Sequence, residues 1–381
     1  MCRSTDAPEW MSARRVVCLG VGLIVDGALD EGVEGDLASE LGVSGRHLRR
    51  LFNNHLGVTP SRLARASRLR RAARFLVATD IAIAEIAHRA GFGSIRQLNR
   101  VCREVFGTTP IELRRGGVDR FAQTEILTLR LPTTIGSEWT STLDRLGSTA
   151  VPQVEFVDRS AYRRVVVVDG VPGAFEMAAP ANGHLTMRID LQDWRELLHV
   201  VHRAISLLYP EGVARESWNN SLTDDRGGDL AATSPPRVPD VLGVWDPFEL
   251  AVKEALSAQF SSSGVEAITS QLAEVLGTPT RSPIHPRLTR SFPSPETLAA
   301  SNLGSFGLEP STQHALRRLA IEVRDGRSPF SSAADIGEGG RVPANSPTAP
   351  WIKSGPRSSS YIDFDPDALD VDGLDRQTKS A

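Results

Sequence analysis

The sequence predicts an α+β protein of several domains. An all-α region comes first, followed by a small antiparallel α+β domain, a partial helical bundle and a disordered C-terminal tail. Three observations lead to this class. One helical pattern occurs twice between residues 35 and 115. Short segments of alternating or β-branched residues follow between residues 124 and 190. Helical periodicity then returns at Trp245 and fails near Arg327.

The length of 381 residues predicts two or three domains. Changes in composition and pattern divide the chain at 1–11, 12–117, 118–210, 211–240, 241–326 and 327–381. No apolar run is long enough to span a membrane, and no signal peptide is evident. Cys2, Cys18 and Cys102 lack metal-ligand spacing, which favours a reducing cytoplasm. No metal and no cofactor are expected. We expect Cys18 and Cys102 to be buried in helices.

The repeated pattern has matched landmarks at a spacing of fifty residues. Gly57 corresponds to Gly107, and Pro60 corresponds to Pro110. Each copy begins with a short helix of small and apolar residues, at 36–41 and 83–90, and a glycine follows it (Gly42 and Gly91). Two copies of one supersecondary unit are therefore expected, and the unit looks like a helix-turn-helix.

The second helix of each copy has a predicted cap and a predicted buried face. Ser44 and Ser94 occupy the N-cap positions, where a hydroxyl accepts a free backbone N–H. Six residues at helical spacing should face the core: Leu48, Leu51, Phe52, Leu98, Val101 and Cys102.

The remaining positions of these second helices are basic or amide residues that should face outward: Arg46, Arg49, Arg50, Arg96, Gln97, Asn99, Arg100 and Arg103. Residues 44–115 contain 15 Arg, no Lys and four acidic residues, an excess of 11 positive charges in a chain whose net charge is −3. Arginine binds phosphate or the guanine edge, and amides can pair with adenine. The pattern predicts double-stranded DNA as the partner. The alternative is a solvated, arginine-rich helix without a ligand.

These residues resemble the DNA-binding domain of the AraC family of transcription regulators. The resemblance implies two helix-turn-helix units joined by a linking helix near Pro60–Thr79, which here carries arginines at 62, 65, 68, 70, 71 and 74. The two recognition helices would enter successive major grooves, about 34 Å apart, on one face of the duplex. RNA polymerase is a further candidate partner of such a regulator.

The region after Arg115 predicts a different architecture. Strands are expected at 124–131, 153–157, 162–168 and 185–190, with helices at 139–146 and 191–208. Residues 211–240 look like a linker. Helices are then expected at 247–259, 264–276, 294–301 and 310–324.

Three segments of this second half resemble the bacterial 3-methyladenine DNA glycosylase II family, here placed behind an Ada-type regulator. They are Tyr162–Gly170 with the following Pro172-Gly173, Phe248–Ser261, and Phe292–Ala300 continuing to Leu319. The resemblance implies an enzyme that flips an alkylated base out of the duplex and cleaves its glycosidic bond. It also implies a helix-hairpin-helix that grips the DNA backbone and a carboxylate that stabilises the cationic sugar.

The hairpin and the carboxylate match the family only in part. Gly355 would be the glycine that approaches a backbone phosphate, but Lys353 and Arg357 replace a glycine and a tryptophan of the family pattern. Asp372 falls where the family has its catalytic aspartate. The alternative interpretation is that Asp372 is a solvated carboxylate in an acidic tail, because a catalytic group needs a packed surrounding shell.

The first residues resemble the end of an Ada-type methyl-acceptor domain, in which Cys2 would be a relic of a four-cysteine zinc site. One thiolate cannot hold a structural zinc, so no zinc is expected. We expect a cytoplasmic DNA-binding regulator of the alkylation response with an inactive glycosylase-like half. One alternative is an active bifunctional glycosylase, and another is a scaffold.

Overall fold

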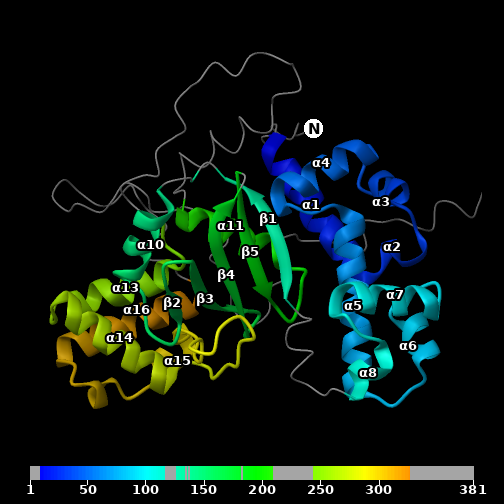
Figure 1. Cartoon of the computed structure of the whole chain (residues 1–381). Coiled ribbons are helices and arrows are strands. Elements are labelled where there is room, and N and C mark those ends of the chain that lie inside the picture. The colour runs from blue at the N-terminus through cyan, green and yellow to red at the C-terminus, as the bar shows by residue number, and fades with distance from the viewer. Residues whose placement is uncertain are drawn as a thin grey trace, which may run out of the picture.

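A computed structural model of the chain describes residues 9–115, 126–133, 135, 138–181, 183–208 and 243–326. It contains three regions (Figure 1). A helical region built from α1–α8 lies next to the β1 edge of a five-stranded sheet, and the helices α13–α16 lie toward the β2 edge. The predicted linker at 211–240 and the tail from 327 onward lie outside the described residues.

The helical region follows the predicted repeat. Its helices are α1 (Glu9–Asp26), α2 (Ala28–Glu31), α3 (Glu34–Glu40), α4 (Gly45–Leu56), α5 (Pro60–Ala78), α6 (Ile83–Arg89), α7 (Ile95–Phe106) and α8 (Pro110–Arg115). We call α3 with α4 unit one, and α6 with α7 unit two. The helix α5 begins with a proline at its first position, as expected where that N–H has no partner, and it joins the two units.

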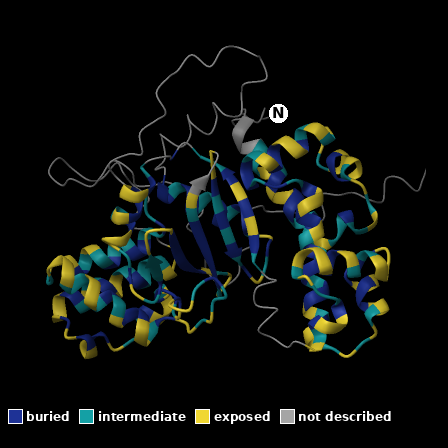
Figure 2. Cartoon of the chain, viewed as in Figure 1, coloured by how far each residue is buried: buried dark blue, intermediate teal, exposed yellow. Residues whose placement is uncertain are grey.

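The sheet is antiparallel throughout, with strand order β1-β5-β4-β3-β2. Its strands are β1 (Leu127–Pro132), β2 (Glu155–Val157), β3 (Ala161–Val168), β4 (Val171–Ala181) and β5 (His184–Asp190). The helices α10 (Trp139–Gly147) and α11 (Leu197–Leu208) complete the α+β domain. Alternation places one apolar face of the sheet against α10 and α11. Figure 2 shows that the middle strands β3 and β4 are largely buried.

The other face of the sheet is covered by the irregular chain between α14 (Ser262–Leu276) and α15 (Pro295–Ala300). Ile284 and Leu288 from this segment pack against Val165 and Ala174 of the sheet. A separate hydrophobic cluster holds the remaining elements together: α13 (Pro247–Ser257), α14, α15, the short 3₁₀ helix Leu303–Phe306 and α16 (Pro310–Arg324).

Three details correct the expectations. The strand β4 lies in a segment where proline and glycine masked the strand pattern, and a Cβ at Gly173 would approach the Asp190 carbonyl oxygen within 2.6 Å. The helix α11 begins at Leu197, six residues later than expected, because residues 191–196 are irregular and end in a turn at 195–196. Cys18 is exposed rather than buried, whereas Cys102 is buried as expected.

Candidate nucleic-acid interface

The two second helices of the repeat are built with the same caps. The Ser44 hydroxyl accepts the His47 backbone N–H at 3.2 Å, and the Ser94 hydroxyl accepts that of Gln97 at 3.2 Å. Gly57 and Gly107 end α4 and α7 in the left-handed conformation, with φ of 62° and 67°. The short preceding helices end in the same way, at Gly42 and Gly91. The sequence repeat is therefore a structural repeat.

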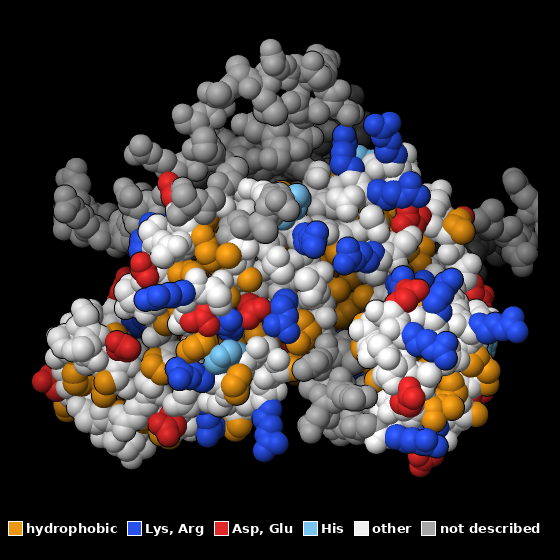
Figure 3. All heavy atoms as spheres, viewed as in Figure 1, with side chains coloured by type: hydrophobic (Ala, Val, Ile, Leu, Met, Phe, Trp, Pro, Cys, Tyr) orange, Lys and Arg blue, Asp and Glu red, His pale blue; other side chains and the backbone are white. Residues whose placement is uncertain are grey.

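Each of these helices buries the face that the sequence predicts. In both units the expected core positions are buried: Leu48, Leu51, Phe52, Leu98, Val101 and Cys102. The opposite faces carry the candidate arginines, all of which are exposed: Arg46, Arg49, Arg50, Arg96, Arg100 and Arg103. Burial of the apolar face thus leaves two ridges of guanidinium groups in solvent, and the helical region displays many basic side chains (Figure 3).

The arginines of unit one differ in their neighbours. Arg49 pairs with Glu34, which also accepts the Ser61 backbone N–H at 3.0 Å. The Nη2 atom of Arg50 lies 3.0 Å from the Nδ1 atom of His47. Within the described residues, the Arg46 side chain makes no hydrogen bond or ion pair. Arg46 is therefore the side chain of this unit with the greatest freedom to meet a base, while Glu34 competes for Arg49.

The amide residues of unit two are engaged within the unit itself. The Gln97 Oε1 atom accepts the Gly93 backbone N–H at 3.0 Å, and Asn99 donates to the Ile95 carbonyl at 3.0 Å. The Arg100 Nε atom lies 3.9 Å from Glu104. Arg96, like Arg46, makes no such contact among the described residues. These hydrogen bonds favour Arg96 and Arg100 over Gln97 and Asn99 as the side chains that would reach DNA.

One exposed residue of α7 was not singled out by its sequence pattern. Ile95 is the first residue of the helix and keeps 42% of its surface exposed, whereas its counterpart in unit one is Gly45. The first turn of a recognition helix is the part that meets base edges, and an apolar side chain there can contact a thymine methyl group. The signal that could have revealed it was an isoleucine directly after an N-cap serine.

The linking helix α5 uses its arginines inside the molecule. Arg71 donates to both carboxylate oxygens of Asp30, at 2.7 and 2.5 Å, and Arg65 pairs with Glu104 of α7. Arg70 and Arg74 donate to backbone carbonyls at the end of β5. The basic composition of this helix therefore serves packing between elements, at least for these four side chains.

The glycosylase-like half contains a buried ionic network that joins β3 to α13. Arg164 donates to Glu155 at 2.8 Å and pairs with Glu249, and the Tyr162 hydroxyl donates to Glu155 at 2.5 Å. Burial raises the pKa of Glu249. For Glu155, burial opposes ionisation, but the charges of Arg164 and Lys253 together with hydrogen bonds from Tyr162 and the Val151 backbone hold the pKa below its usual value. This network fixes the sheet to the helices that follow it.

The proposed catalytic and metal residues are not positioned by the structure. Asp372, Gly355 and Cys2 all lie outside the described residues. Within the described part of the chain, no group of three or more His, Cys, Asp or Glu side chains could hold a metal ion. The same part has no helix with the length and apolar character of a membrane span.

Two family models match the chain. The model described as a helix-turn-helix domain matches residues 37–116, and the AlkA N-terminal domain matches residues 128–208. The chain carries an AraC-type helix-turn-helix domain followed by an AlkA N-terminal domain. The order of the two domains agrees with the two resemblances that the sequence shows.

A relative from Mycobacterium tuberculosis matches most of the chain. It is named "probable bifunctional transcriptional activator/DNA repair enzyme AlkA" and is 31% identical over 331 residues. The alignment covers 84% of this chain, which is more than the two family models cover together, but only 65% of the relative's length. This chain therefore spans less than two thirds of that relative.

Other similarities cover single parts. The transcriptional regulator GbdR of Pseudomonas aeruginosa is 37% identical over 94 residues, which are 24% of this chain and 26% of GbdR. A solved AraC-type DNA-binding regulator from Chromobacterium violaceum is 32% identical, with 29% of this chain and 95% of that chain covered and a TM-score of 0.24. A 3-methyladenine DNA glycosylase from Archaeoglobus fulgidus is 17% identical, with 51% and 69% covered and a TM-score of 0.37.

Proposed function

We propose that this chain is a sequence-specific DNA-binding regulator of the alkylation-damage response. The observation that carries the proposal is the pair of equivalent helices α4 and α7, which we call the reading helices. They have the same type of N-cap, and each exposes a ridge of arginine side chains. The mixed name of the Mycobacterium relative, a transcriptional activator and a DNA repair enzyme, supports the link to alkylation damage. Arg46, Arg50, Arg96 and Arg100 would contact bases or phosphates, and Arg49 and Arg103 would contact phosphates.

Selection of binding sites from random duplex DNA tests this function. The full chain should enrich one sequence with two half-sites spaced by about one helical turn. Arg46→Ala and Arg100→Ala should each weaken binding to that sequence by about 1–3 kcal/mol and relax the preference at one half-site. Arg318→Ala removes an exposed arginine of α16 and serves as the matched control. Equal losses on selected and random DNA would instead mark Arg46 and Arg100 as phosphate contacts.

A transcription assay tests the regulatory role. A reporter placed behind the selected sequence should respond to a methylating agent only when the chain is present. If the response requires recruitment of RNA polymerase, the purified chain and polymerase should bind the promoter fragment cooperatively. If the selected sequence gives no regulated transcription, the chain binds DNA but does not regulate transcription, and the proposed regulatory role is wrong.

Excision of alkylated bases is the second candidate function, favoured by the AlkA N-terminal domain and by the similarity to a DNA repair enzyme. We propose that this half is inactive, since the tail around Gly355 and Asp372 departs from the family pattern. Incubation with methylated duplex DNA should therefore release no 3-methyladenine. Release that disappears in Asp372→Asn would establish the active alternative.

A further inference from the structure

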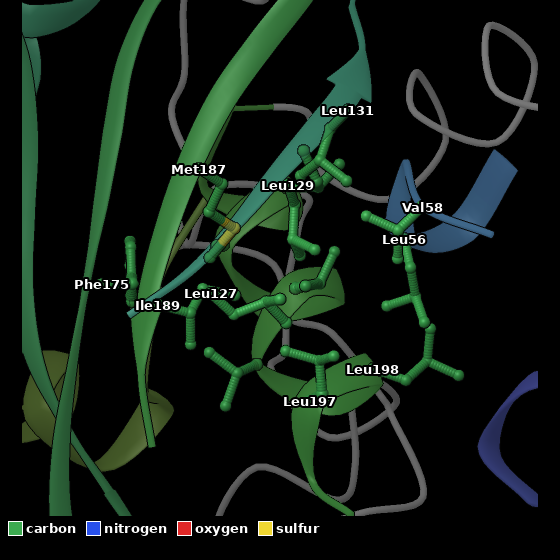
Figure 4. Close-up of a cluster of buried hydrophobic side chains, with 14 of the residues drawn as sticks. Leu56, Val58, Leu127, Leu129, Leu131, Phe175, Met187, Ile189, Leu197 and Leu198 are labelled. Atoms are coloured by element: carbon green, nitrogen blue, oxygen red, sulfur yellow. The ribbon is translucent and has the colours of Figure 1, made fainter. Parts of the chain in front are cut away.

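Unit one and the α+β domain share a single hydrophobic cluster. Leu56 and Val58, at the end of α4 and just after it, lie with Leu129 and Leu131 of β1 and with Leu198 of α11 in this cluster (Figure 4). The helix α1 extends the same cluster through Val17, Val21 and Ile24. Unit two belongs to a different cluster, whose buried members come from α5, the α6–α7 segment and α8. The two copies of the repeat therefore pack in different hydrophobic clusters.

The two glycines that end the reading helices show this difference at one atom. A Cβ at Gly57 would lie 1.9 Å from the Arg130 carbonyl oxygen of β1, so the helix end meets the strand backbone directly. A Cβ at Gly107 would meet nothing within 4 Å. Both glycines have the same left-handed conformation. At Gly107 the lack of a side chain therefore serves the φ angle alone, whereas at Gly57 it also allows β1 to approach the helix end.

A buried arginine fixes the linking helix to the same domain. Arg70 retains 6% of its surface exposed, and its Nη2 atom donates to the carbonyl of Leu191 and, at 2.9 Å, to that of Gln192. Its guanidinium carbon lies 5.0 Å from the centre of the Trp194 ring. Arg74, one turn later, donates to the Gln192 carbonyl at 3.1 Å. Such charge-assisted hydrogen bonds hold a position more firmly than neutral ones.

Polar contacts at the edge of this interface point in the same direction. Buried His55 of α4 lies with its Nδ1 atom 3.3 Å from the Nε2 atom of His202 on α11, and the two rings stack. Arg195, just before α11, pairs with Asp26 at the end of α1. The α+β domain thus contacts α1, the C-terminal end of α4 and the middle of α5.

We propose that the α+β domain is a brace that positions the first reading helix for its DNA half-site; this inference rests on the proposed reading of DNA. The brace holds α4 by its C-terminal end, and Arg46 lies in the first turn at the opposite, exposed end. That first turn is the part of a recognition helix that meets base edges. Among the described residues, the buried side chains of unit two lie in a cluster that the α+β domain does not share, so its half-site should be read without the brace. Gly57 is accordingly a positioning residue for unit one, and Arg70 is one through α5, whose Leu63 and Ala64 lie in the same cluster as unit one.

The glycine pair gives a matched test in the full chain. Arg46→Ala and Arg96→Ala first assign the two half-sites of the selected sequence to unit one and unit two. Gly57→Ala should then reduce the base preference at the unit-one half-site by about tenfold, the equivalent of about 1.4 kcal/mol, and leave the unit-two half-site unchanged. Gly107→Ala imposes the same left-handed strain without touching another element, so it should leave the unit-one preference intact.

Arg70 gives a second test that does not depend on the folding of Gly57→Ala. Arg70→Ala should reduce the unit-one preference in the same way. Arg70→Lys, which keeps a charged donor, should restore at least part of it. Loss at both half-sites to the same extent in a folded Arg70→Ala chain would identify a general stability effect and overturn the brace.

The failures of this inference and of the proposed function are distinguishable. A wild-type chain that selects no sequence would overturn the proposed function and the brace with it. A wild-type chain that selects two half-sites, both of which survive in Gly57→Ala and Arg70→Ala, would overturn the brace alone.

Discussion

At the scale of single residues, arginine takes three different roles in this protein. Arg46 is exposed and, within the described residues, without an ion pair, which suits it to a ligand. Arg70 spans two domains through backbone carbonyls. Arg164 is buried between two carboxylates. The residue type is the same, and the surroundings decide the role, because a guanidinium group keeps its charge in all three settings.

Arg164→Met should destabilise the chain strongly. The change leaves Glu155 and Glu249 buried without their common partner, and removal of one member of a buried ionic group costs about 3–5 kcal/mol. The midpoint of urea unfolding, followed in the full chain, should fall accordingly. Arg318→Ala, on the exposed surface of α16, should change stability by less than about 0.5 kcal/mol. A midpoint for Arg164→Met equal to that of this control would show that the network contributes little.

At the scale of elements, the start of α8 is held by one carboxylate. Glu112 accepts the Thr108 hydroxyl at 2.5 Å, and at 2.9 Å both the backbone N–H and the hydroxyl of Thr109. The Thr108 hydroxyl, followed by the Thr109 groups, lowers the pKa of Glu112 from 4.5 to about 2. The folded state therefore binds this proton less readily than the unfolded state. The resulting stability is present above the ordinary pKa and is lost as pH falls through the folded value.

Glu112→Gln should accordingly flatten the acid dependence of stability. As pH is lowered from about 5 to about 2, the temperature of the wild-type unfolding midpoint should fall because Glu112 becomes protonated. The midpoint of the variant should fall less over the same interval. Thermal unfolding followed by circular dichroism measures both. Glu85→Gln, on the exposed side of α6, provides a control carboxylate. An identical acid dependence in wild type and Glu112→Gln would contradict the capping role.

At the scale of the whole molecule, the contact between unit one and the α+β domain contains histidines that must stay neutral. Burial, with Arg14 as a second cause, lowers the pKa of His55 from 6.5 to about 4. Burial likewise lowers the pKa of His202, with Arg14, His55 and His199 adding to the effect. A base with a depressed folded pKa stabilises the fold fully above its ordinary pKa, and this contribution is lost as pH falls toward the folded value.

The contact should therefore weaken on mild acidification. As pH is lowered from about 7 to about 5, the thermal midpoint of the wild type should fall, because the unfolded chain binds protons that the buried histidines of the folded chain do not bind. His55→Phe keeps a ring and removes one titrating group, so its midpoint should fall less over this range. His88→Gln changes an exposed histidine of α6 and should follow the wild type. Parallel curves for His55→Phe and wild type would count against a buried neutral His55.

Comparison of the elements shows which features were predictable. The caps at Ser44 and Ser94, the glycine stops and the buried helix positions depend on residues within a few places of one another, and the structure confirms them. The strand β4 was missed because its strand pairing outweighs the local preferences of Pro172 and Gly173. The contacts of the linking-helix arginines were not predicted, because the carbonyl partners of Arg70 lie more than a hundred residues away in the sequence.

The sequence by itself determined the repeated units, their caps, the arginine ridges and the order of the helical and α+β regions, because short-range hydrogen bonding and periodicity fix these features. Only the tertiary structure decided that unit one rests on the sheet, that Gly57 meets β1, and that Arg70 and Arg164 connect domains rather than face solvent. These features depend on contacts between residues far apart in the chain, for which no local pattern exists.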